Sequence, residues 1–163
     1  MSIKSVIRNS PLPLAVVRSA VKWYADKLMG KRLASNITCR FEFIHDYESD
    51  SGTTATCIWE DDNVRPREFL IELDASLDPA TILQNLAHEM VHVKQWARGE
   101  LKDVMREYSL CKWKGTVIDT DKIDYYDSPW EIEAFGREYG LYVRWRDQYP
   151  PVKAMIGELN EEK

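Results

Sequence analysis

Two histidines and a glutamate stand at a spacing that can build a metal site. The segment His88-Glu89-Met90-Val91-His92 places the histidines four residues apart. In a helix, residues i and i+4 share a face, so both imidazoles can bind one Zn²⁺. Glu89 then lies about 100° around the helix, beside the metal, where its carboxylate can act as a general base. The spacing therefore predicts His88 and His92 as zinc ligands and Glu89 as the base.

The helix that must hold these residues has clear ends, and we expect it over about 79–98. Asp78 is a preferred N-cap, Pro79 is tolerated at the first helical position, and Gly99 suits the residue after the last turn. One face is apolar and predicts the core contact: Leu83, Leu86, Met90, Val93 and Ala97. The opposite face is polar and carries the site: Thr81, Gln84, Asn85, His88 and His92. This arrangement favours a metal site over the alternative, in which the histidines are ordinary surface residues of a core helix.

A third ligand is expected from a downstream carboxylate. Catalytic zinc usually takes three protein ligands and leaves a fourth position for water. The remaining histidine, His45, belongs to a strand-and-loop region before the motif, and the three cysteines are widely scattered. Glu131 and Glu133 open the last predicted helix, about 130–149, which Ser128-Pro129 precedes.

We predict Glu133 rather than Glu131 as this ligand. Ile132, Phe135, Tyr139 and Val143 would mark the core face of the helix, and Glu133 shares its side with two glycines. Glycines there, Gly136 and Gly140, would let the helix approach another backbone closely. A glutamate in the first turn, such as Glu131, can be explained by its interaction with the helix dipole.

The rest of the chain predicts one α+β domain spanning residues 1–163. A helix is expected over Leu14–Met29, and Leu110–Ile118 predicts a hairpin around Lys114-Gly115. Strands are expected over Ile37–Ile44, Thr53–Trp59 and Phe69–Leu73. The residues after Pro151 are expected to form a frayed tail. Repeats and linkers that would divide the chain are not evident.

Composition narrows the possible partners. The 163 residues are 44% hydrophobic and 30% charged, with a net charge of −5. This balance makes nucleic acid an unlikely partner, and an apolar run of about 20 residues, the length that spans a bilayer, is missing from the sequence. The start of the chain lacks the layout of an export signal. Three cysteines, Cys39, Cys57 and Cys111, suit a reduced cytoplasmic protein better than a disulfide framework. The sequence carries no signal for an oligomeric state.

The motifs resemble those of a known peptidase class. His88-Glu89-x-x-His92 followed by Glu133-Ala134 resembles the gluzincin side of the zincin metallopeptidases. Lys112-Trp113-Lys114-Gly115, Tyr125 and 129–134 resemble small phage and bacterial metallopeptidases related to SprT-like proteins. The resemblance covers about residues 73–149. It implies a zincin fold, with an N-terminal helix and a small twisted sheet packed on the motif helix. It also implies zinc-dependent hydrolysis of a peptide or protein, with an edge strand, here Phe69–Leu73, that binds substrate as an added strand.

The sequence departs from these families in several places. Thermolysin-like gluzincins carry an Asp four residues after the ligand Glu, where this chain has Arg137. The interval from His92 to Glu133 is long. SprT-like proteases use a third histidine as a ligand and often contain a zinc ribbon, and this sequence has neither feature. The DNA-linked activity of those proteases is therefore not expected of this protein.

The expected reaction needs a donor for the tetrahedral oxyanion. Glu89 would take a proton from the water that attacks the peptide carbonyl. Tyr125 or Tyr126 could donate to the oxyanion, and Tyr125 matches the family-like spacing; the alternative is that both rings only pack. The competing function is a non-catalytic zinc-binding module that recognises a protein partner. A purely structural zinc is disfavoured, because a closed site needs a fourth ligand and gains nothing from Glu89.

Overall fold

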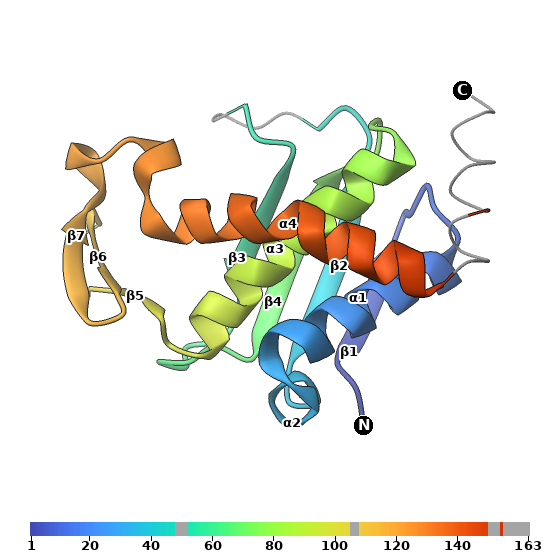
Figure 1. Ribbon diagram of the computed structural model, residues 1–163. Helices are drawn as coiled ribbons and strands as arrows, with labels where there is room; N and C mark the ends of the chain where they lie inside the picture. Colours follow the sequence, from blue (N-terminus) through green and yellow to red (C-terminus); the bar gives the residue numbers. More distant parts are fainter. Residues whose placement is uncertain (48–51, 105–107, 150–153, 155–163) are drawn as a thin grey trace.

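The protein has an α+β fold built on a mixed four-stranded sheet (Figure 1). The computed structural model describes residues 1–47, 52–104, 108–149 and 154. The strands of this sheet are β1 (Lys4–Arg8), β2 (Thr38–Ile44), β3 (Ala55–Trp59) and β4 (Glu68–Asp74). Their order is β1-β2-β4-β3, in which β1, β2 and β4 are parallel and β3 runs antiparallel at the edge.

The helices cover one face of this sheet in two layers (Figure 1). The four α-helices of the described residues are α1 (Leu14–Met29), α2 (Lys31–Ala34), α3 (Pro79–Ala97) and α4 (Pro129–Gln148). Alternate side chains of β2 and β4, such as Phe41 and Ile71, are fully buried in the core shared with α1 and α3. α4 crosses over α3 on the side away from the sheet. α3 is therefore the middle layer.

A smaller antiparallel sheet links α3 to α4. Its strands, in the order β5-β6-β7, are β5 (Leu101–Asp103), β6 (Leu110–Trp113) and β7 (Thr116–Asp119). Two single-turn 3₁₀ helices follow, η1 (Thr120–Lys122) and η2 (Tyr125–Asp127). The second turn ends directly before α4, so it fixes where that helix begins.

Local interactions explain why α3 begins where the sequence predicts. The Asp78 carboxylate accepts a hydrogen bond from the backbone N–H of Thr81 at 3.1 Å, and Pro79 occupies the first turn. The predicted apolar stripe is buried, with Leu83 and Met90 both 0% exposed. Across the described residues, each helix is too short or too polar to cross a bilayer.

The structure confirms the predicted α+β class and the main helices, and it corrects one strand assignment. Phe69–Leu73 belongs to β4, which pairs with β2 on one side and β3 on the other, so it is not an edge strand. The edge strand nearest α3 is β3. β1 and β5 were not predicted. The tail that was expected to be frayed falls almost entirely outside the described residues.

Candidate metal centre

Three potential ligand atoms converge where α4 crosses α3. His88 and His92 come from the middle of α3, and Glu131 comes from the first turn of α4. The two histidine Nε2 atoms lie 3.2 Å apart. Glu131 Oε2 lies 3.2 Å from His88 Nε2, and Glu131 Oε1 lies 3.4 Å from His92 Nε2. The three side chains are 7% to 11% exposed, so the group is shielded from bulk water.

The spacing of these atoms fits a zinc ion. Ligand bonds of about 2.0–2.1 Å in a tetrahedral site imply separations of roughly 3.3 Å between ligand atoms. The two histidine Nε2 atoms are 3.2 Å apart, and each has its own Glu131 oxygen nearby, Oε2 at 3.2 Å from His88 and Oε1 at 3.4 Å from His92. Two imidazole nitrogens and one carboxylate also leave the fourth position of such a site open. The donor set and its dimensions therefore suit a catalytic zinc site.

The outer nitrogen of each histidine has its own hydrogen-bond partner. His88 Nδ1 lies 2.7 Å from Glu138 Oε2 of α4, and Gln84 Nε2 donates to the other oxygen of that carboxylate at 2.7 Å. His92 Nδ1 lies 2.8 Å from Gln95 Oε1. Each Nδ1 faces an acceptor, so each neutral ring keeps its proton there and presents the Nε2 lone pair to the centre.

Three acceptors facing one another need a cation or a proton between them, and the pKa shifts reflect this. Burial lowers the pKa of His88, but hydrogen bonds to Glu131 and Glu138 outweigh it and raise that pKa to about 9. Burial also opposes the charged form of His92, yet its hydrogen bond to Glu131 raises its pKa. Burial raises the pKa of Glu131, but hydrogen bonds from both histidines lower it to about 2. The cluster is built to hold positive charge.

The structure does not bring Glu133, the predicted third ligand, next to the two histidines. Glu133 Oε1 lies 2.6 Å from the Lys94 ammonium, and its Oε2 accepts from Gln95 Nε2 at 3.0 Å. Among the described residues, the group that can share an ion comprises His88, His92 and Glu131. The glutamate next to the histidines is therefore Glu131, whose position had been explained by its interaction with the helix dipole.

The error lies in the helical phase of α4. Its buried face is a stripe at helical spacing: Glu131, Ala134, Leu141, Tyr142 and Trp145. Ile132 and Tyr139, which were expected in the core, are 57% and 62% exposed. A methyl group added at Gly136 would meet nothing within 4 Å, so that glycine does not mark a close approach.

Glu138 contacts the candidate cluster through His88, and sequence reasoning missed it. It stands seven residues after Glu131, which is two helical turns along the same face. The signal was present in the spacing of Ala134, Leu141 and Trp145, which predicts that both glutamates face α3. A correct phase would have identified the ligand and its neighbour together.

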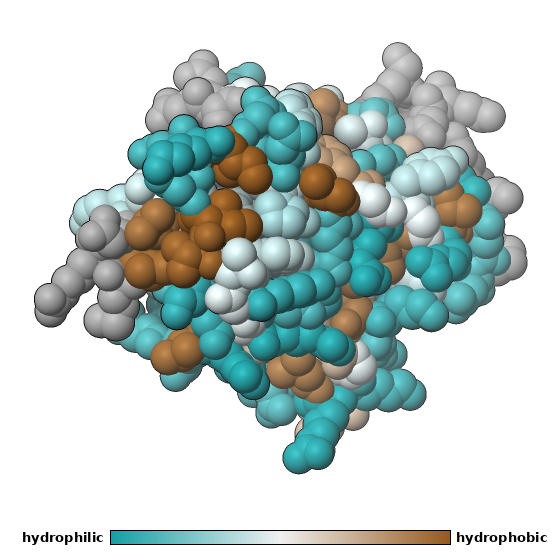
Figure 2. Space-filling view, turned by 60° about the vertical axis from the view of Figure 1, so that its left-hand side comes forward, coloured by the Kyte–Doolittle hydropathy of each residue, from teal (hydrophilic) through white to brown (hydrophobic). Residues whose placement is uncertain are grey.

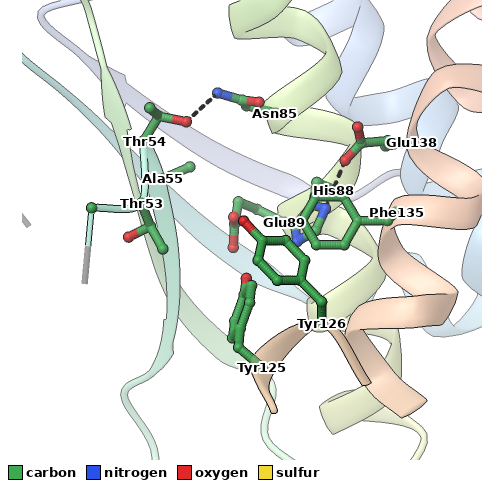
Figure 3. Close-up of a pocket in the computed structure, with 11 residues that line it drawn as sticks. Thr53, Thr54, Ala55, Asn85, His88, Glu89, Tyr125, Tyr126, Phe135 and Glu138 are labelled. Carbon is green, nitrogen blue, oxygen red and sulfur yellow. Dashed lines mark hydrogen bonds and ion pairs between the residues drawn. The ribbon is translucent and has the colours of Figure 1, made fainter. Parts of the chain in front are cut away.

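Glu89 lies in a pocket of about 470 Å³ beside the cluster (Figure 3). The pocket is bounded by the start of β3 and the residues before it, by α3, and by aromatic rings from η2 and α4. Glu89 and His88 both contribute to its wall. Burial raises the pKa of Glu89, only partly offset by the nearby histidines. A carboxylate with a raised pKa is suited to accept a proton.

Tyr125 and Tyr126 form the lower wall of this pocket in Figure 3. Burial and a hydrogen bond to Glu131 raise the pKa of Tyr125, so its hydroxyl stays protonated and can donate. Tyr125 therefore lies beside Glu131, and its role as an oxyanion donor stays a prediction. Tyr126 is 69% exposed and packs on the Phe135 ring with 5.7 Å between centroids.

Figure 2 shows one face of the molecule, where hydrophobic residues gather in patches on a largely hydrophilic surface.

Comparisons with known proteins found no match. Family models, curated proteins and solved structures all lack a significant counterpart to this chain. A functional conclusion therefore depends on the geometry of the site.

Proposed function

We propose that this protein is a zinc-dependent metallopeptidase of the zincin class, with His88, His92 and Glu131 as the metal ligands. One observation carries the proposal: one ligand atom from each of the three buried side chains lies within 4.8 Å of the other two, and the buried Glu89 lines a pocket beside them. Sequence position alone would not provide this, because Glu131 reaches the histidines from another helix.

Zinc bound there would supply a Lewis acid that polarises a carbonyl and acidifies a water molecule. The chain supplies the remaining groups. Glu89 is next to His88 in sequence and faces the pocket, so it can accept a proton from the attacking water and pass it to the leaving amine. Its burial keeps bulk water from competing for that proton.

Tyr125 is the proposed donor to the oxyanion. Its hydroxyl is held near the cluster by the hydrogen bond to Glu131, and its ring lines the pocket. A neutral donor that is already in place stabilises developing negative charge without reorganisation. Tyr126 is more exposed and is assigned to the wall of the pocket only.

The substrate would lie along β3, in place of the strand that the sequence suggested. β3 pairs with β4 alone within the described residues, so its other edge can accept an extended peptide. The chain just before and at the start of this strand, Thr53–Ala55, borders the pocket opposite Tyr126 and Phe135 (Figure 3). A peptide added there would pass in front of Glu89.

The layout of the fold supports the zincin assignment. The resemblance implies an N-terminal helix and a small sheet packed on the motif helix, and α1, the four-stranded sheet and α3 correspond to these parts. In thermolysin-like gluzincins the Asp that follows the ligand Glu supports a zinc histidine, and here Glu138 contacts His88 Nδ1 at 2.7 Å. Glu138 stands two helical turns after the proposed ligand Glu131, whereas the Asp of those gluzincins stands one turn after its ligand Glu.

The test is a comparison of wild type with Glu89→Gln. We expect one zinc per chain in both proteins by metal analysis, and cleavage of unfolded casein by the wild type alone. The amide keeps the size of the side chain but accepts no proton at neutral pH. Cleavage by Glu89→Gln at the wild-type rate would remove Glu89 from the mechanism. Zinc without cleavage in the wild type would instead favour the zinc-binding module.

A further inference from the structure

A buried ion pair stands next to the candidate metal centre, and its members are not ligands. Lys94 is only 5% exposed on α3, and its Nζ lies 2.6 Å from Glu133 Oε1 and 2.7 Å from Glu100 Oε2. Burying a lysine is costly unless its charge is paired. The arrangement therefore calls for an explanation in terms of what it holds in place.

The ion pair is connected to His92 through Gln95. Gln95 is fully buried, and its Nε2 donates to Glu133 Oε2 at 3.0 Å and to the Trp130 carbonyl oxygen at 2.9 Å. Its Oε1 lies 2.8 Å from His92 Nδ1. The sequence of contacts runs from Lys94 to Glu133, then to Gln95, then to His92.

Each step of this network determines the next. A glutamine amide can present either its oxygen or its NH₂ group to a neighbour, so Gln95 alone would not fix the proton on His92. Glu133 removes the ambiguity because an ionised carboxylate only accepts hydrogen bonds. The Trp130 carbonyl also only accepts. The NH₂ group of Gln95 must therefore face these two groups, which leaves its oxygen facing His92.

We propose that Glu133, held by Lys94, is a positioning residue that sets the tautomer of His92 through Gln95. An oxygen at Nδ1 requires the proton on that nitrogen, so the neutral ring has its lone pair on Nε2. Nε2 is the atom that faces His88 and Glu131. The inference rests on the proposed function only in that this lone pair is the one assigned to zinc.

The two histidines are thus fixed by different means. His88 has a carboxylate, Glu138, directly on its Nδ1 at 2.7 Å, whereas His92 has a neutral amide with the carboxylate one step further away. A carboxylate needs no further orientation to accept a proton donor, but an amide does. This difference explains why an additional acidic residue and a buried lysine stand behind His92.

Glu133→Gln is the decisive variant. Glu133 offers two oxygens, one to Lys94 and one to Gln95. A glutamine has one oxygen, which the lysine ammonium takes, so its NH₂ group would face the NH₂ group of Gln95. Rotation of the Gln95 amide relieves this conflict but turns its oxygen toward the Trp130 carbonyl, so the two amide orientations compete. The rotated orientation places the NH₂ group on His92 Nδ1, which moves the ring proton to Nε2. Lys94 keeps Glu100 as a partner, so the fold is retained.

The matched control is Arg137→Gln. Arg137 Nε contacts the same Glu133 oxygen at 3.1 Å, but its side chain is 52% exposed and it does not restrict Gln95. This variant removes a cation from Glu133 while leaving the network intact.

Two measurements separate the outcomes. Long-range ¹⁵N–¹H correlation on the metal-free chain, at a pH where the ring is neutral, reports which nitrogen of His92 carries the proton. We expect Nδ1–H in wild type and Arg137→Gln, and a large fraction of Nε2–H in Glu133→Gln. Zinc affinity from competition with a chelator should fall by about 10- to 100-fold in Glu133→Gln and stay unchanged in the control.

The inference would be overturned by an unchanged His92 tautomer in a folded Glu133→Gln protein. If that variant fails to fold, Gln95→Glu provides the test. It keeps an acceptor for His92 but sets a carboxylate against Glu133, so the tautomer should be retained while zinc affinity changes. Loss of the Nδ1–H form in Gln95→Glu would then contradict the proposal. The tautomer measurement needs no metal, so a wild type that binds no zinc would refute the proposed function and still test this network.

Discussion

α3 and α4 both contribute to the candidate metal centre, but they are held in the protein differently. α3 lies between the sheet and α4, and its core face is sealed, with Leu86 and Val93 both 0% exposed. α4 is the outer layer, and it leaves large apolar side chains such as Ile132 and Phe135 at 57% and 43% exposure. Two of the proposed ligands come from the inner helix and the third comes from the outer helix.

This difference separates two tasks. The inner helix sets the histidine pair and Glu89 at a spacing that depends only on helical geometry. The outer helix provides Glu131, the third proposed ligand. It also contacts His88 directly through Glu138, and it reaches His92 through Glu133 and Gln95. If this division holds, zinc binding should depend on residues of α4 as strongly as on those of α3.

The largest effect is expected from removing one ligand from either helix. His92→Ala and Glu131→Ala should both lose stoichiometric zinc after dialysis, because two remaining ligands hold the ion poorly. Glu133→Ala should retain zinc with an affinity about 10- to 100-fold lower. Metal analysis and chelator competition measure all three. Release of zinc by Glu133→Ala but not by Glu131→Ala would return the ligand role to Glu133.

A smaller effect is expected at the turn that leads into α4. Tyr125→Phe should keep zinc and lower kcat by about 10²- to 10³-fold, the range for loss of one oxyanion donor. Tyr126→Phe is the control, since its side chain is largely exposed and is assigned no donor role. Peptide-cleavage kinetics measure both. Equal rates for the two variants would mean that both rings only line the pocket.

The junction between the helices should make stability depend on pH. The pKa of His88 is raised from 6.5 to about 9. Its contribution to folding is therefore complete below about pH 6.5 and is lost as pH rises through 9. The Tm of the metal-free protein should fall across this window, and the increase in Tm on adding zinc should grow as protons cease to compete. His88→Ala should flatten both trends in thermal unfolding. A metal-free Tm that rises over the same window would contradict the arrangement around His88.

The smallest effect concerns the outer surface of α4. Gly136→Ala should raise the free energy of unfolding by roughly 0.5–1 kcal/mol, because alanine favours a helix interior and the added methyl meets nothing within 4 Å. Zinc affinity should not change. Denaturant unfolding with a parallel chelator titration checks both. Destabilisation with loss of zinc would mean that Gly136 faces α3 after all.

The same contrast explains what the sequence could predict. α3 has an N-cap at Asp78, a terminal glycine and one uninterrupted apolar stripe, so its limits and its phase follow from local rules. α4 has aromatic residues on several sides, because some face the core and others face the pocket. Tyr142 is buried and Tyr139 is exposed, and periodicity alone does not separate them. The phase is settled by packing against α3.

The failure to predict β1 has a related cause. β1 is five residues, and its burial alternates only between exposed and half-buried positions. Its existence depends on parallel pairing with β2, more than thirty residues away, for example Val6 with Arg40. Pairing partners at such distances are not encoded in a local pattern. β3 and β4 were predicted because each has β-branched and aromatic residues, but their order in the sheet was not.

The far end of α4 carries a consequence for how zinc and folding are coupled. Trp145 is fully buried, donates to Ser19 Oγ at 3.2 Å and packs against Tyr24 of α1. It stands about 21 Å along the helix from Glu131, at 1.5 Å per residue. A ligand that binds only the folded state stabilises every contact on which its site depends. Zinc at one end of α4 would therefore also stabilise the packing of Trp145 at the other end.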